Sequence, residues 1–144
     1  MNEPDVPSHR SSTPQGASGE ECPFCRIPAS ATVAASEHGI ALVDAFPVTP
    51  GHTLVVPRIH VASLFQLPPE VQSDLWRLVS RVRSVMAEDP RVDGFTVGVN
   101  DGIAAGQTVP HAHIHVVPRR TGDVPDPRGG VRWVVPDRAA YWER

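Results

Sequence analysis

The chain has 144 residues and a formal net charge of -3 at pH 7. A chain of this length has room for one hydrophobic core and little more. With this charge, and with no basic run longer than Arg119-Arg120, the sequence gives no electrostatic case for binding nucleic acid. No apolar stretch approaches the roughly 18 residues that a membrane helix needs, and the first residues lack the apolar core of a signal peptide. We therefore expect a small cytoplasmic protein that binds neither nucleic acid nor membranes.

Residues 1–20 are rich in Ser, Pro, Gly and charged residues, with almost no large apolar side chain. Such a segment cannot offset the entropy lost on ordering, so we expect a flexible tail followed by a single domain over residues 21–144. Within that domain, residues 38–43 and 53–56 are expected to form strands joined by a turn that is rich in Pro and Gly. Residues 61–67 are expected to add a short helix.

The one long helix is expected to begin at Pro68-Pro69-Glu70, because Pro fits the first turn of a helix and an acidic residue there suits the helix dipole. Apolar residues then recur every three or four positions, as on the buried face of a helix: Val71, Leu75, Leu78, Val79, Val82, Val85 and Met86. Residues 95–100 follow as a strand, and residues 132–135 are expected to form a last edge strand.

Histidines occupy every second position of Pro110-His111-Ala112-His113-Ile114-His115-Val116-Val117. A strand sends alternate side chains to opposite faces at steps of about 6.5 Å, so His111, His113 and His115 would share one face. The β-branched residues of this segment favour the extended form. Neutral imidazole accepts a proton, attacks phosphorus or binds a metal near pH 7, so three in strict alternation predict a functional site rather than a solvated strand face.

The segment His111-Ala112-His113-Ile114-His115-Val116-Val117 resembles the signature of the histidine triad (HIT) nucleotide hydrolases and transferases. The likeness extends over residues 22–120, with flanks similar to the fragile-histidine-triad branch: Asn100-Asp101-Gly102, Ala105-Gly106-Gln107-Thr108-Val109, Val117-Pro118-Arg119-Arg120 and Pro50-Gly51-His52-Thr53-Leu54-Val55-Val56-Pro57. The resemblance implies an α+β fold of the HIT type, in which an antiparallel half-barrel sheet carries one long and one short helix. It also implies a homodimer whose sheets associate.

The segment Cys22-Pro23-Phe24-Cys25 holds the only two cysteines of the chain. Taken alone, the pair suits a metal site, a redox pair or two buried thiols, and tetrahedral zinc would need histidines as further ligands. The resemblance to bacterial-type HIT proteins implies such a set, in which His60 and the first triad residue, His111, join Cys22 and Cys25. Four protein ligands leave no open position, so this zinc would be structural.

With His111 assigned to zinc, His113 has the place of the family's nucleophile. A neutral imidazole can attack the α-phosphorus of a nucleotide and form a nucleotidyl-histidine, which water then cleaves. The resemblance gives His115 the role of a donor to phosphate or leaving group, with His52 orienting it. The implied reaction is hydrolysis of a nucleoside phosphoramidate or dinucleoside polyphosphate, with release of a nucleoside monophosphate.

Other residues resemble positions that bind the substrate in the family. Asp44 matches the carboxylate that accepts both ribose hydroxyls. Asn100 has the place of an amide that contacts phosphate, although the fragile-histidine branch has Gln there. Three residues just before the triad offer backbone N–H groups and a hydroxyl to phosphate: Gly106, Gln107 and Thr108. Taken alone, Asp44 is more typical of a turn or cap, and His52 of a loop.

Three alternatives remain open. A nucleotidyltransferase or phosphorylase would use phosphate or a sugar phosphate as acceptor in place of water. A zinc hydrolase would use all three triad histidines as an open metal site, although the motif contains no Asp or Glu. A sensor would bind a nucleotide and leave it intact. Departures from the family pattern at Ala45, Pro110 and Ala112 bear on the selectivity for base and leaving group.

Overall fold

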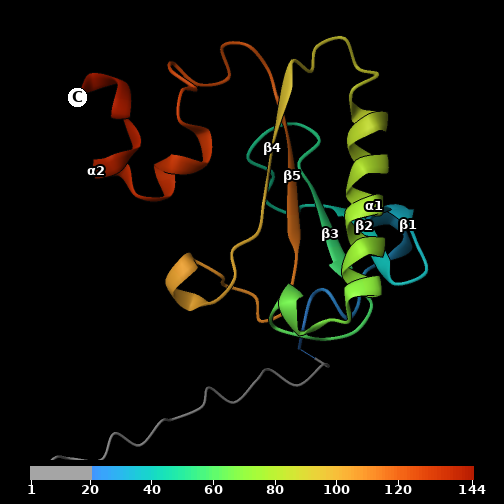
Figure 1. The fold of residues 1–144 in the computed structure, drawn as a ribbon. Helices are drawn as coiled ribbons and strands as arrows, with labels where there is room; N and C mark the ends of the chain where they lie inside the picture. Colours follow the sequence, from blue (N-terminus) through green and yellow to red (C-terminus); the bar gives the residue numbers. More distant parts are fainter. Residues whose placement is uncertain (1–20) are drawn as a thin grey trace, which may run out of the picture.

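The structure is a computed structural model that describes residues 21–144, so the expected tail over residues 1–20 lies outside the described residues. Five strands form one antiparallel sheet in the order β1-β2-β3-β5-β4. They are β1 (Thr32–Ala35), β2 (Gly39–Val43), β3 (Thr53–Pro57), β4 (Gly94–Gly98) and β5 (Ile114–Arg119). The long helix α1 (Pro69–Met86) lies along the sheet (Figure 1). The predicted α+β class, with an antiparallel sheet and one main helix, is confirmed.

The main hydrophobic core lies between α1 and one face of the sheet. The sheet contributes Ala41, Val55, Ile114 and Val116, and the helix contributes Val71, Leu75, Leu78, Val79 and Val82. The predicted helix face is confirmed except at Val85, which is exposed. The helix packs closely on β2, because a Cβ added at Gly39 would lie 2.5 Å from Cδ2 of Leu75. A larger residue at position 39 would force the side chain of Leu75 to shift.

The opposite face of the sheet carries a second apolar cluster and the histidines. Leu42, Leu54 and Val56 are buried there. In the pairing of β3 with β5, Leu54 lies opposite His115, while Val55 and Ile114 lie opposite each other on the core side. The alternation predicted for the triad therefore places imidazoles on one face and core residues on the other. The paired strand begins only at Ile114, so His111 and His113 lie in the segment that leads into it.

The segment between β3 and α1 differs from the prediction of a short helix over residues 61–67. It contains a single 3-10 turn, η2 (Leu64–Gln66). Ser63 caps this turn, since its Oγ accepts a hydrogen bond from the N–H of Phe65 at 3.2 Å and its own N–H donates to Oε1 of Gln66 at 3.1 Å. This capping box, just before α1, gives hydrogen-bond partners to two backbone N–H groups at the start of the turn.

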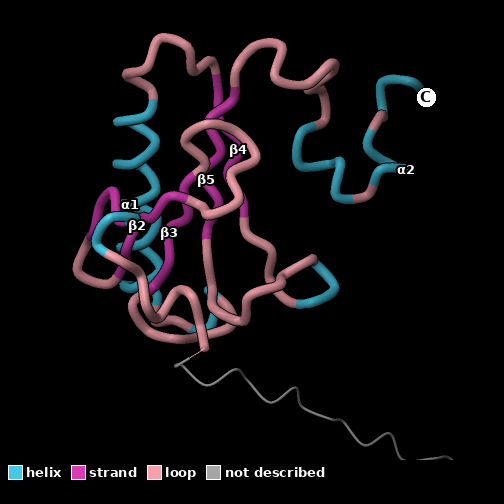
Figure 2. Tube along the Cα trace, turned by 180° about the vertical axis from the view of Figure 1, so that it is seen from behind, coloured by secondary structure: helices cyan, strands magenta, loops and turns pink. Residues whose placement is uncertain are grey.

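The edge strand predicted over residues 132–135 is wrong. Gly130–Val134 form a 3-10 helix, η4, and Pro136–Ala139 form the short helix α2. Gly129 and Gly130 have φ angles of 88° and 45°, values that a strand does not contain, so they override the β-propensity of the valines that follow. Figures 1 and 2 show this C-terminal segment on the β4 side of the sheet, away from α1. No helix within residues 21–144 has the length and apolar character needed to span a bilayer.

Candidate functional site

A cavity of about 680 Å³ lies on the sheet face opposite α1. Five residues predicted for the site line it: Asp44, His52, Thr108, His113 and His115. Apolar residues make up most of the remaining wall, among them Phe24, Leu42, Phe46, Val48, Leu54 and Val109. This volume is within the range of roughly 300 to 1,000 Å³ that small-molecule sites occupy, and an apolar wall with a few polar groups is typical of such sites.

One ring nitrogen of His113 makes a hydrogen bond to the backbone, and the other has no such bond within the described residues and can act as a nucleophile. Its Nδ1 lies 2.8 Å from the backbone oxygen of His111, and because a carbonyl only accepts, Nδ1 carries the proton. The lone pair of the neutral ring is then on Nε2. The residue is only 7% exposed, and its exposed part faces the cavity. This is the tautomer that a nitrogen nucleophile needs.

His52 and His115 form a proton-ordered pair beside it. The N–H of Val48 donates to Nδ1 of His52 at 3.2 Å, so Nε2 of His52 carries its proton and donates to Nδ1 of His115 at 2.9 Å. The remaining proton of His115 is therefore on Nε2. That atom is buried and has no hydrogen-bond partner among residues 21–144. A buried N–H without a partner is rare, and this one is available to a bound group.

Burial keeps both rings of this pair neutral at pH 7. It lowers the pKa of His115 to about 4, with smaller contributions in the same direction from His113 and His52, while Asp44 acts in the opposite direction. Burial also lowers the pKa of His52, against the opposing effect of Asp44. His115 is thus a neutral hydrogen-bond donor over the physiological pH range, and the tautomers of His52 and His115 persist there.

Within residues 21–144 the carboxylate of Asp44 has two polar contacts. Its Oδ1 accepts a hydrogen bond from the N–H of Phe46 at 2.8 Å, which closes a turn, and its Oδ2 lies 3.5 Å from Nε2 of His52. The side chain also lines the cavity. The turn role considered from the sequence is therefore present, and carboxylate lone pairs remain for a ligand.

Three predicted substrate residues are not among the cavity walls: Asn100, Gly106 and Gln107. The side chain of Gln107 instead fixes the loop before the triad, because Oε1 accepts from the N–H of Gly102 at 2.9 Å and Nε2 donates to the carbonyl of Ala62 at 2.8 Å. Gly106 ends the 3-10 turn η3 (Ile103–Ala105) with a φ of 91°. In this geometry Gly106 and Gln107 shape the loop, and Thr108 is the residue of this loop that lines the cavity.

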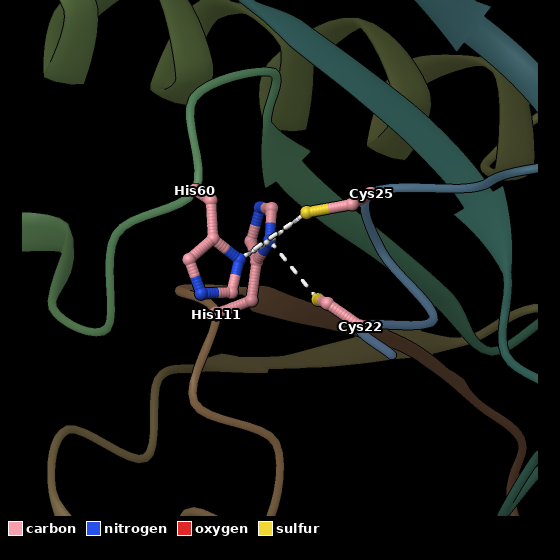
Figure 3. A group of neighbouring side chains, drawn as sticks. All are labelled: Cys22, Cys25, His60 and His111. Carbon is pink, nitrogen blue, oxygen red and sulfur yellow. Dashed lines mark hydrogen bonds between the residues drawn. The ribbon is translucent and has the colours of Figure 1, made fainter. Parts of the chain in front are cut away.

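The four predicted zinc ligands form one cluster, shown in Figure 3. Nδ1 of His111 lies 3.4 Å from Sγ of Cys22, 3.6 Å from Sγ of Cys25 and 3.2 Å from Nδ1 of His60, and Sγ of Cys25 lies 3.2 Å from Nδ1 of His60. For Zn–S bonds of about 2.3 Å and Zn–N bonds of about 2.0 Å, a tetrahedron separates sulfur from nitrogen by about 3.5 Å and two nitrogens by about 3.3 Å. The cluster has the size of a tetrahedral zinc site.

The orientation of His111 supports the same conclusion. Its Nε2 lies 2.8 Å from the carbonyl oxygen of Pro57, so Nε2 carries the proton and Nδ1 presents its lone pair to the cluster. Histidines that ligate metals commonly donate their other N–H to a backbone carbonyl in this way. The residues present therefore fit zinc.

Sequence reasoning did not single out the cavity residues that come from the Cys-x-x-Cys segment. Pro23, Phe24 and Arg26 line the cavity although they lie far from the triad in sequence. Their position between and beside two predicted zinc ligands was the available signal, because a segment tied to His111 must also lie near His113.

The model of the HIT domain family matches residues 27–122, and the chain belongs to this family. The chain is 44% identical to bis(5'-adenosyl)-triphosphatase of Dictyostelium discoideum over 88 residues, which are 61% of this chain and 59% of that protein. It is 40% identical to the asymmetrical bis(5'-nucleosyl)-tetraphosphatase of Schizosaccharomyces pombe over 83 residues, 58% of this chain and 46% of that one. The matched segments thus span less than two thirds of either enzyme.

Among solved structures, the fold is similar to that of a zinc-bound histidine triad family protein from Mycobacterium smegmatis. The TM-score is 0.67 with 35% sequence identity, and the match covers 81% of this chain and 92% of that one. Together with the Cys22, Cys25, His60 and His111 cluster, this neighbour confirms the predicted resemblance to HIT proteins with a Cys-x-x-Cys zinc site.

Proposed function

We propose that this protein hydrolyses a nucleotide at its α-phosphorus through a nucleotidyl intermediate on His113. The observation that carries the proposal is that two histidines lining one cavity each have their proton fixed on a known nitrogen. His113 has its proton on Nδ1 and its lone pair on Nε2, whereas His115 has a proton on a buried and unpartnered Nε2. The names of the two enzymes described above, a triphosphatase and a tetraphosphatase, support the same substrate class.

The first step would be attack of Nε2 of His113 on the α-phosphorus. A bond forms between nitrogen and phosphorus, and the bond from phosphorus to the leaving oxygen or nitrogen breaks with its electron pair on the leaving group. The imidazole becomes cationic, and the carbonyl of His111 stabilises it through the hydrogen bond to Nδ1. The N–H of His115 would donate to a phosphate oxygen or to the leaving group as its charge develops.

The second step would be attack of water on the nucleotidyl-histidine. The bond between phosphorus and Nε2 breaks, the lone pair returns to His113, and the water proton passes to solvent or to a basic group at the site. The product is a nucleoside monophosphate. His52 would act throughout as a positioning residue, because its proton on Nε2 keeps the lone pair of His115 on Nδ1.

The zinc cluster would have a structural role. Cys22, Cys25, His60 and His111 would fill all four positions, and zinc would supply a fixed link between the N-terminal segment and the approach to β5. This assignment uses His111 for structure, which argues against a three-histidine catalytic metal site.

For substrate binding we propose that Asp44 accepts the ribose hydroxyls and that Thr108 donates to phosphate, since both line the cavity. Gly106 and Gln107 do not line the cavity, and we propose that they act by holding the loop that carries Thr108. Gly106 has the positive φ angle at the end of η3, and Gln107 fixes the position of the residues before Thr108.

A turnover screen tests the proposal and its alternatives. Purified protein would be incubated with adenosine phosphoramidate, diadenosine triphosphate and diadenosine tetraphosphate, each with and without inorganic phosphate. Release of AMP in all conditions supports hydrolysis. Release of ADP that requires phosphate would identify a phosphorylase, and nucleotide binding without any product would identify a sensor.

We also propose that the protein is a cytoplasmic homodimer with associated half-barrel sheets. Strand β4 lies at the edge of the sheet described here, and such an edge is able to pair with another chain. Val131, Val134 and Val135 are exposed in the segment next to it. A reducing compartment suits two cysteines that serve as zinc thiolates. Sedimentation equilibrium tests the dimer, and fractionation of the source cells tests the location.

A further inference from the structure

Phe24 lies between the zinc cluster and the proposed nucleophile. It directly precedes Cys25 and follows Cys22 by two residues, and the N–H of Cys25 donates to the carbonyl of Cys22 at 3.1 Å, which closes the turn that carries it. Its ring meets His111 edge to face, with centroids 5.8 Å apart and planes at 88°. It also meets His113, with centroids 5.1 Å apart and planes at 62°. One side chain thus contacts both a zinc ligand and the nucleophile.

Phe24 contacts His113 at the cavity wall, and apolar residues of the sheet support its ring. Phe24 is half-buried and packs against the buried cluster of Leu42, Leu54 and Val56 on the same face of the sheet. It also lines the cavity. A residue in this position has one side supported by the sheet and the other in contact with the ring whose orientation the reaction depends on.

His113 needs such a contact, because a single hydrogen bond does not fix an imidazole. The bond from Nδ1 to the carbonyl of His111 fixes one atom of the ring, and the ring torsion of histidine is broad. In-line attack requires the lone pair on Nε2 to point at phosphorus in a narrow range of directions. The remaining ring contacts of His113 among residues 21–144 are with Phe24 and with His115, whose centroid is 5.0 Å away.

We propose that Phe24 is a positioning residue for His113, and that the Cys-x-x-Cys segment contributes to the reaction by holding this ring in place. The catalytic consequence rests on the proposed function, whereas the effect on the orientation of His113 does not. Edge-to-face aromatic pairs are favourable beyond the area that they bury, so removal of the ring costs orientation as well as packing.

The test compares three substitutions at Phe24 with one at Phe46, an aromatic residue that lines the same cavity, is 87% exposed and makes no ring contact with a histidine among residues 21–144. We expect Phe24→Ala to lower kcat about tenfold, equivalent to about 1.4 kcal/mol in the barrier. Phe24→Leu, which keeps apolar volume, should recover little of kcat, and Phe24→Tyr, which keeps the ring, should recover most of it. Phe46→Ala should act on KM more than on kcat.

A second measurement reports on the ring itself. In zinc-loaded protein with labelled histidine, the nitrogen spectrum of wild type should show one form of His113 with the proton on Nδ1. Phe24→Ala should broaden or split these signals while zinc content stays at the wild-type value. A wild-type kcat in Phe24→Ala, or equal kcat in the Leu and Tyr variants, would overturn the inference, as would an unchanged His113 spectrum. If the wild type itself shows no turnover, the proposed function fails, and the spectrum alone decides the role of Phe24.

Discussion

His52 Nε2 lies 2.9 Å from Nδ1 of His115, and this contact decides which nitrogen of His115 carries a proton. This series of hydrogen bonds begins at the N–H of Val48, which donates to Nδ1 of His52 and leaves the proton of that ring on Nε2. A backbone amide therefore sets the state of two imidazoles in succession, and the last N–H of the series is the buried one that has no partner among residues 21–144.

The first prediction follows from this series. His52→Ala removes the donor to His115, so the ring can take the other tautomer and lose its N–H toward the substrate. We expect kcat to fall about tenfold to a hundredfold, as for the loss of a hydrogen bond in the transition state. His52→Gln retains an amide N–H near the same place and should recover part of the loss. Equal kcat values for the Ala and Gln variants would contradict the role of His52 as a hydrogen-bond donor to His115.

The second prediction concerns the nucleophile. His113→Ala should lower turnover by roughly three or more orders of magnitude while nucleotide binding persists, because the substitution removes the covalent step and leaves most of the cavity wall intact. Single-turnover assays with radiolabelled substrate, together with calorimetric binding of AMP, measure the two effects. His38→Ala is the matched control, since His38 lies outside the cavity lining. Wild-type turnover in His113→Ala would remove the proposed mechanism.

The third prediction concerns the metal. Purified protein should contain close to one zinc per chain, and Cys22→Ser should lose the zinc and lower Tm. The ligands come from three separated parts of the sequence, so zinc binding and folding are coupled. Metal analysis and thermal unfolding of both proteins test this, with His38→Ala again expected to retain zinc. Wild-type protein without metal, whose two thiols react freely in the folded state, would contradict the assignment.

The fourth prediction is a pH dependence of stability. The pKa of His115 is about 4 in the folded protein against a usual value of 6.5, so between these values the unfolded chain binds more protons than the folded one. The free energy of unfolding should therefore be at its full value above pH 6.5 and fall as the pH drops toward 4, by on the order of 2 kcal/mol at pH 5. His52 acts in the same direction.

Urea unfolding at pH 7 and pH 5 measures this dependence. Acid also weakens zinc binding, so wild type is compared with His115→Gln, in which the zinc ligands are unchanged. The variant should lose less stability between the two pH values than wild type does. Equal losses would mean that burial of His115 does not produce the dependence.

The sequence predicted those features that depend on local periodicity. The alternation of His111, His113 and His115 with small and apolar residues identified the two faces of the sheet, and the spacing of apolar residues in α1 identified its buried side. Both hold because side-chain direction in regular elements repeats with a fixed period. The zinc set required the family resemblance, because the position of His60 relative to the cysteines depends on how the chain folds.

The features that were missed depend on contacts between distant segments or on backbone conformation. Gln107 is predicted from the sequence to offer its backbone N–H to phosphate, but that N–H donates to the carbonyl of Gly102 at 3.2 Å, and its side-chain amide donates to the carbonyl of Ala62, 45 positions away. Phe24 was not singled out from the sequence, because its ring contact with His113 depends on how the Cys-x-x-Cys segment folds against the triad. In residues 132–135 the valines indicate a strand, but two preceding glycines with positive φ angles turn the chain into η4.

The last prediction distinguishes a ribonucleotide enzyme from a general phosphoramidase. If the carboxylate of Asp44 accepts the 2'- and 3'-hydroxyls, Asp44→Ala should weaken ribonucleotide substrates by roughly 1.5 to 3 kcal/mol, the range for hydrogen bonds to a charged group. Substrates with 2'-deoxyribose should lose less. The same substitution also removes the turn contact from Oδ1 to the N–H of Phe46, which would damage every substrate alike.

A double cycle separates these two effects. Values of kcat/KM are measured for ribo and 2'-deoxy substrates with wild type and with Asp44→Ala, and the coupling between the carboxylate and the hydroxyl is the difference of the two losses. Asp44→Asn is the control variant, because its amide oxygen can still accept from Phe46 while the charge is removed. We expect the Asp44→Asn variant to keep the wild-type Tm and to lose most of the preference for ribose. An equal loss for both sugars in Asp44→Ala, with a lowered Tm, would mean that Asp44 serves the turn alone.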